Sequence, residues 1–91
     1  MQQDIKRDIK SIIVLLATQG MINLGEIKDP ISNTTKLDME GARLFIDLLE
    51  VLEKKTKGNL TTEEEGFLTE ILSNINKVYD NKTKKMRPQD N

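Results

Sequence analysis

The chain has 91 residues, with 14 Lys and Arg against 15 Asp and Glu, and it contains neither cysteine nor histidine. A chain of this length forms one small domain. Without cysteine there are no disulfides, thiolate metal sites or cysteine nucleophiles. Without histidine, the usual base at neutral pH and the commonest transition-metal ligand are missing. We therefore expect a non-enzymatic protein with no catalytic residues, no cofactor and no bound metal.

The charges are distributed unevenly along the chain. Residues 58–80 carry one Lys against five acidic residues, a net charge of −4, whereas residues 81–91 carry four basic residues against one Asp, a net charge of +3. An acidic segment and a basic tail suit self-docking or a protein partner, but not a surface that binds nucleic acid as a whole. We predict a single helical domain over residues 1–80 and a polar, basic, disordered tail over residues 81–91.

The first predicted helix covers about residues 3–24 and is apolar on nearly every side. One stripe at helical spacing consists of Ile5, Ile9, Ile12 and Leu16. The other faces carry further apolar groups, from Val14, Leu15 and Ala17. A helix of this kind must be covered by protein from several directions, and we expect part of that cover to come from another subunit.

The same stretch is too short to cross a membrane. Its unbroken apolar run, residues 12–17, falls far below the roughly 20 residues that a span needs. Asp4 and Asp8 precede the run and no convincing cleavage site follows it, which argues against a secretory signal. We expect no membrane insertion and a cytoplasmic location.

A long connection, residues 25–37, follows the first helix. Gly25 suits the left-handed position after a helix end, and Asp29-Pro30 marks a turn. Its apolar residues are expected to pin it to the helices; these are Ile27, Ile31 and Leu37. Thirteen residues are many for a helix–helix connection, so the loop is either a strap over the end of the core or a place of specific contact. In the second case the candidate partner-binding residues are Glu26, Lys28, Asp29 and Pro30.

The second predicted helix, about residues 38–57, is expected to be the central element, with Asp38 as its N-cap. Viewed along the helix axis, four apolar side chains lie within about 60° of Phe45: Ala42, Leu48, Leu49 and Leu52. Four more widen the apolar arc to about 220°: Met39, Leu44, Ile46 and Val51. A helix that is apolar over more than half its circumference needs cover from at least two directions.

A third helix is predicted over about residues 62–80. Gly58 is expected to end the second helix in the left-handed conformation, and Thr61 with Glu64 forms a capping box at the start of the third. The short connection predicts a tight antiparallel hairpin. The apolar arc of the third helix is about 140°, as in an ordinary amphipathic helix. The predicted fold class is therefore all-α: a small three-helix domain with a C-terminal antiparallel helical hairpin and a long loop between helices 1 and 2.

The chain resembles a family of small bacterial proteins known as domain of unknown function 1844. The similarity lies in the runs LLATQGMINLGEIKDP and LDMEGARLFIDLLEVLEKKTKGNLTTEEEGFL, roughly residues 14–75. Its most specific parts are LGE-I-x-DP and GNLT-x-EE. Lys28 stands where proline is common in the family, which should loosen the start of the loop without changing the fold. The resemblance implies a soluble bacterial helical protein with no assigned activity, so it brings no catalytic residues.

The surplus of apolar surface predicts self-association. Three helices of this size bury about one face each, yet the first is apolar all round and the second over about 220°. We expect a homo-oligomer, most simply a two-fold dimer. The candidate interface residues are Val14, Leu15, Leu44 and Val51. The leading interpretation is a helical interaction module that associates with itself and with an unidentified protein partner.

Two other functions stay open. One is a nucleic-acid-associated accessory protein that uses Lys54, Lys55, Lys57 and the basic tail, and an affinity that falls steeply with salt would favour it. The other, a weaker alternative, is an enzyme that uses carboxylates and a bound metal ion. Thermal stabilisation by magnesium or manganese would be its sign.

Overall fold

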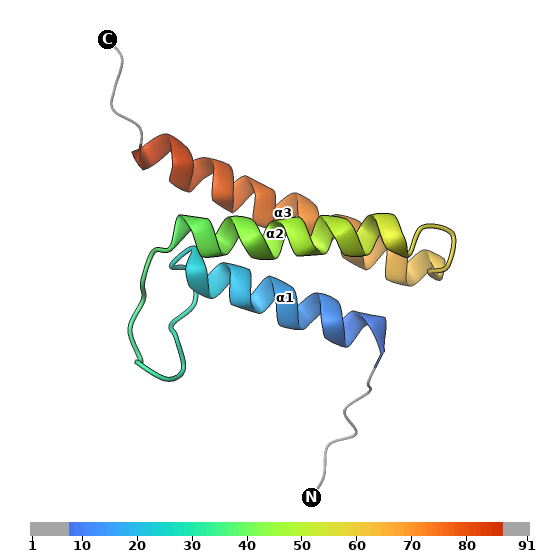
Figure 1. The fold of residues 1–91 in the computed structure, drawn as a ribbon, viewed down its shortest axis with the longest axis horizontal. Helices are drawn as coiled ribbons and strands as arrows, with labels where there is room; N and C mark the ends of the chain where they lie inside the picture. Colours follow the sequence, from blue (N-terminus) through green and yellow to red (C-terminus); the bar gives the residue numbers. More distant parts are fainter. Residues whose placement is uncertain (1–7, 87–91) are drawn as a thin grey trace, which may run out of the picture.

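The computed structural model describes residues 8–86, and these residues form three helices and no strand. The helices are α1 (Ile9–Asn23), α2 (Met39–Lys55) and α3 (Thr62–Met86). Each helix packs against both of the others, and α1 and α2 run in opposite directions (Figure 1). The prediction of an all-α fold is confirmed.

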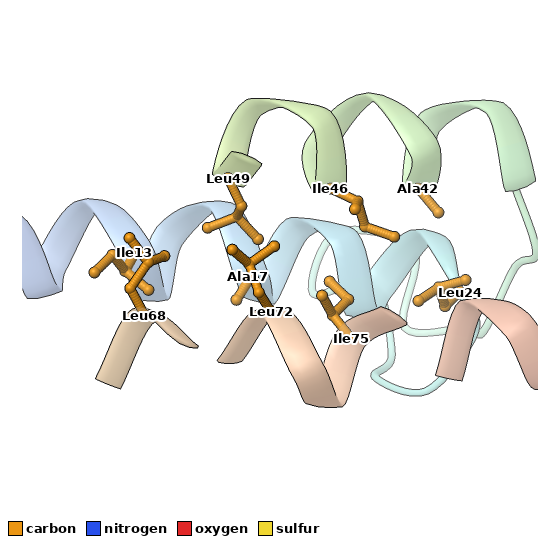
Figure 2. Packing of buried hydrophobic residues seen from close by; sticks show 9 residues of the cluster. All are labelled: Ile13, Ala17, Leu24, Ala42, Ile46, Leu49, Leu68, Leu72 and Ile75. Atoms are coloured by element: carbon orange, nitrogen blue, oxygen red, sulfur yellow. The ribbon is translucent and has the colours of Figure 1, made fainter. Parts of the chain in front are cut away.

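The core is a cluster of aliphatic side chains to which all three helices contribute (Figure 2). Its members are Ile13, Ala17, Leu24, Ala42, Ile46, Leu49, Leu68, Leu72 and Ile75. The α2 and α3 members recur at i, i+4 and i+7, which places them on one edge of each helix. No polar or charged side chain is buried among the described residues. The fold is therefore held by aliphatic packing, in which each fully buried Ile or Leu side chain contributes about 1.5–3 kcal/mol.

The buried face of α2 differs from the expected one. Ala42, Ile46 and Leu49 are fully buried, whereas Leu48 is 39% exposed. The core-facing arc is therefore turned by about 60° from Phe45. Leu48 belongs to the predicted apolar arc around Phe45, but it lies on the exposed side of that arc. The physical reason is that α1 and α3 cover α2 from neighbouring directions and leave the Leu48 side open.

Helix starts in the described residues follow local signals. Asp8 caps α1, since its carboxylate accepts a hydrogen bond from the Ser11 N–H at 3.2 Å. Asp38 caps α2 in the same way, accepting from the Gly41 N–H at 3.0 Å. The predicted N-cap at Asp38 is confirmed. The first helix was predicted to start near residue 3, which lies outside the described residues; the described helix begins after Asp8.

The connection between α2 and α3 also follows its sequence signals. Gly58 has a φ of +84°, as the predicted left-handed position requires. Glu64 accepts from the Thr61 N–H at 2.9 Å, while the Thr61 hydroxyl accepts from the Glu64 N–H at 3.1 Å. The predicted capping box is confirmed. Since α2 ends where α3 begins, these contacts lie together at one end of the molecule (Figure 1).

Gly58→Val is expected to destabilise the protein by at least about 1 kcal/mol, because a β-branched residue is poorly tolerated at positive φ. A Cβ at this position would meet no heavy atom within 4 Å, so the cost comes from the backbone conformation alone. The melting temperature should fall by about 4–8 °C. Gly58→Asn is the control, because asparagine tolerates the left-handed region, and it should lose much less. Equal melting temperatures for the valine variant and the wild type would contradict this account.

Helix α3 continues to Met86, beyond its predicted end at residue 80. The Thr83 hydroxyl donates to the Tyr79 carbonyl at 2.9 Å, and Lys82 forms an ion pair with Glu26 of the loop at 2.9 Å. Lysine is a good helix former and its charge suits a helix C-terminus. The prediction of a disordered tail is therefore wrong for residues 81–86, and residues 87–91 lie outside the described part.

Candidate interaction surface

The outer side of α1 exposes large aliphatic side chains. Leu15 is 67% exposed, and Ile12 and Val14 are each 47% exposed. At 100° per residue, Leu15 lies about 160° from the fully buried Ile13. The side of α1 opposite the core is therefore apolar and faces solvent in the described structure.

Helix α2 carries a second exposed stripe. Leu44 is 54% exposed, Leu48 is 39% exposed and Val51 is 50% exposed. Their spacing of i, i+4 and i+7 places them in one row along the helix. This row, the α2 stripe, lies on neither the buried face nor the charged face of α2.

The α2 stripe lies beside the Ile12 side of α1, whereas Val14, about 160° around the helix from Ile12, lies beside α3. A Cβ built on Gly20 of α1 would lie 3.5 Å from the Phe45 Cβ, and Phe45 stands between the buried face of α2 and the α2 stripe. Arg43 marks a different side of α2, because its guanidinium lies 5.0 Å from the centre of the Tyr79 ring on α3. The α2 stripe therefore flanks α1. We call the combined set the apolar surface; it comprises Ile12, Val14, Leu15, Leu44, Leu48 and Val51.

The loop, residues 25–37, is closed at its base. Leu24 and Leu37 form an isolated antiparallel bridge, and the Asp38 N–H donates to the Asn23 carbonyl at 2.7 Å. A loop of this length whose ends meet is of the compact surface type. Gly25 enters it with a φ of +78°, which confirms the predicted left-handed residue. The loop thus leaves the helices in a defined direction and projects beyond them (Figure 1).

The four candidate partner-binding residues of the loop have different roles. Glu26 is held in the ion pair with Lys82. The Asp29 carboxylate accepts from the Ile31 N–H at 2.9 Å, so it shapes the turn. Lys28 and Pro30 are exposed. Two of the four candidates therefore stabilise the loop, and the other two face solvent.

Ile31, at the turn, is 94% exposed. The prediction that it pins the loop to the helices is therefore wrong. Ile27 and Leu37 are partly covered, since they are 42% and 49% exposed. The physical reason is that the hydrogen bonds of Asp29 fold the turn back on itself and carry Ile31 away from the core.

The lysines proposed for nucleic-acid contact lie at two places in the molecule. Lys54 and Lys55 lie in the last turn of α2 and Lys57 follows it, whereas Lys84 and Lys85 lie in the last turn of α3. These two helix ends point to opposite ends of the molecule (Figure 1). These five lysines thus form two separated groups. Arg87 lies outside the described residues.

Two cations have shifted pKa values. The hydrogen bond from Lys10 to Glu63, with an Nζ–Oε2 distance of 2.8 Å, raises the pKa of Lys10. For Arg43, burial lowers the pKa, but the hydrogen bond to Asp47 and the charges of Asp47 and Glu50 outweigh it, so the pKa is raised. Both shifts favour the charged form, so neither side chain is a general base at neutral pH.

The described residues offer no metal site and no membrane span. Among residues 8–86, no three acidic side chains gather closely enough to hold a metal ion. In the same part of the chain, no helix has both the length and the apolar character that a membrane crossing requires.

The model of the family described as Domain of unknown function (DUF1844) matches residues 6–80, most of the chain. The chain belongs to the DUF1844 family. Searches of curated proteins and of solved structures found no match. The DUF1844 region spans α1, α2 and most of α3, so it contains the whole apolar surface and the loop.

Sequence reasoning named four residues of the apolar surface and missed two. Val14, Leu15, Leu44 and Val51 were candidates and are all exposed. Ile12 was placed in the apolar stripe of the first helix and Leu48 in the arc around Phe45, and neither was named as an interface residue. The spacing of Leu48 from Leu44 and Val51 was the available signal, since three apolar residues at i, i+4 and i+7 share a row.

Proposed function

We propose that this DUF1844 chain is a non-enzymatic helical interaction module that associates with itself through the apolar surface. One observation carries the proposal: ten hydrophobic residues are buried, while nine large hydrophobics remain exposed in the described structure. Scattered apolar residues are normal on protein surfaces, but contiguous ones mark interfaces. Six of the nine belong to the apolar surface.

The simplest arrangement is a two-fold dimer, in which the same patch of each copy meets the other. Val14 and Leu15 of α1, with Leu44 and Val51 of α2, are placed at the contact. In the fold that we propose for this dimer, α2 and α3 form an antiparallel hairpin, and the long loop connects α1 with α2. We further propose a cytoplasmic location in a bacterium and an additional protein partner, for which the exposed Lys28 and Pro30 are candidates.

The test is the mass of the wild-type chain in solution. Light scattering coupled to size exclusion is expected to give at least twice the chain mass of 10.4 kDa at tens of micromolar protein. Association through aliphatic contacts should persist at high salt, whereas phosphate contacts weaken steeply as salt rises. A stable monomer over this concentration range would refute the proposal.

A further inference from the structure

A groove between α1 and α3 adjoins the apolar surface. Its walls include Val14 and Thr18 of α1, Ile27 of the loop, and Ile71 and Asn74 of α3. Its volume is about 230 Å³ and no charged residue lines it. Sites for small molecules usually measure about 300–1,000 Å³. The groove is therefore better suited to one or two aliphatic side chains than to a cofactor.

The same chain presents an aliphatic side chain that lacks a pocket. Ile31 is 94% exposed, so it does not occupy the groove of its own chain. The loop that carries it is held at the base by the bridge between Leu24 and Leu37, and at the turn by the hydrogen bonds of Asp29. Ile31 is thus a preorganised knob, and little conformational entropy is lost when it is buried.

We propose that in a pair of copies Ile31 of each chain enters the groove of the other. This inference rests on the proposed self-association and names its specific contact. The exchange is consistent with two-fold symmetry, because the same contact, Ile31 of one chain in the groove of the other, occurs twice in the pair. It is also continuous with the apolar surface, because Val14 both lines the groove and belongs to that surface.

Opposite charges lie near the two elements, alongside Asp29 at the turn, which accepts from the Ile31 N–H, and Lys77 on α3. Lys28 and Lys36 flank the loop turn, while Glu70 directly precedes the groove residue Ile71 and lies one helical turn from Asn74. None of these three charged side chains forms an ion pair within residues 8–86. Opposite charges at the rims would orient the approach of two copies and fix the register of the contact.

The experiment uses two variants of the whole chain. Ile31→Asp removes the knob and keeps the groove, whereas Asn74→Phe is designed to fill the groove with the chain's own ring and keeps the knob. For each variant alone, the dimer dissociation constant measured by sedimentation equilibrium is expected to rise by about tenfold or more for each lost contact. An equimolar mixture should associate more tightly than either variant alone, by about tenfold or more, because one knob still meets one open groove.

Two controls keep the outcomes distinct. Thr35→Asp adds the same charge to the same exposed loop without removing an apolar group, and it should dimerise like the wild type. Circular dichroism should give wild-type helix content for every variant. A wild-type chain that is monomeric would refute self-association itself. If the wild type dimerises, this inference is overturned by normal dimerisation of Ile31→Asp or by a mixture no tighter than its components.

Discussion

The Leu15→Glu variant is expected to be a 10.4 kDa monomer under conditions where the wild type has at least twice that mass. Leu15 is the most exposed large hydrophobic residue of α1 and lies opposite its core-facing edge. A carboxylate buried in an apolar contact without a partner costs far more than the contact gains. Light scattering at several protein concentrations measures the effect directly.

The fold of this variant should be preserved, because the substituted side chain is 67% exposed and makes little contribution to the core. Surface substitutions of this kind usually change the free energy of unfolding by less than about 0.5 kcal/mol. Ser73→Glu is the control: it adds the same charge at an exposed position of α3, outside the apolar surface and the row of Leu15, without removing an apolar side chain. Loss of the oligomer in both variants would assign the effect to charge rather than to the apolar surface.

The second large effect is expected at Gly20. A Cβ at this position would lie 2.7 Å from the Ile75 Cδ1 and 3.5 Å from the Phe45 Cβ. Ile75 is fully buried, so its side chain has little room to move. Gly20→Leu should therefore destabilise the protein by about 2 kcal/mol through overpacking where α1 meets its neighbours. Chemical denaturation, with the midpoint and slope compared with those of the wild type, measures this loss.

Gly66 is the matched control for Gly20, because it also lies inside a helix but has open space around it. A Cβ at Gly66 would meet no heavy atom within 4 Å. Gly66→Ala should stabilise the protein by about 0.5–1 kcal/mol, since alanine loses less backbone entropy in a helix. The two substitutions are thus expected to have opposite signs. A destabilisation of equal size at both positions would argue against close helix packing as the reason why glycine is needed at position 20.

Local sequence signals were sufficient to predict where several of the helices begin or end. Asp38, Gly58 and the Thr61–Glu64 pair were placed correctly, because an N-cap, a left-handed glycine and a capping box each depend on atoms only a few residues apart. The all-α class followed from the apolar periodicity of long segments. These features need no knowledge of how the helices pack.

The candidate site was less accessible to sequence reasoning. An apolar arc of about 220° on α2 indicates surplus surface, but it leaves the rotation of the helix open, since several edges are apolar enough to face the core. Only packing against α1 and α3 decided that Ile46 is buried and Leu48 exposed. The groove was not predicted because its walls come from α1, the loop and α3, which are far apart in the chain.

By itself, the sequence determined the helical class, the helix caps, the turn glycines and the presence of more apolar surface than three helices bury, since each depends on composition or on near neighbours. The tertiary structure decided which apolar residues remain exposed, that Ile31 points away from the core and that α3 continues to Met86. It also decided which glycine is needed for close packing. These properties depend on contacts between segments distant in the chain, such as Gly20 with Ile75 and Glu26 with Lys82, and helical periodicity carries no information about such pairs.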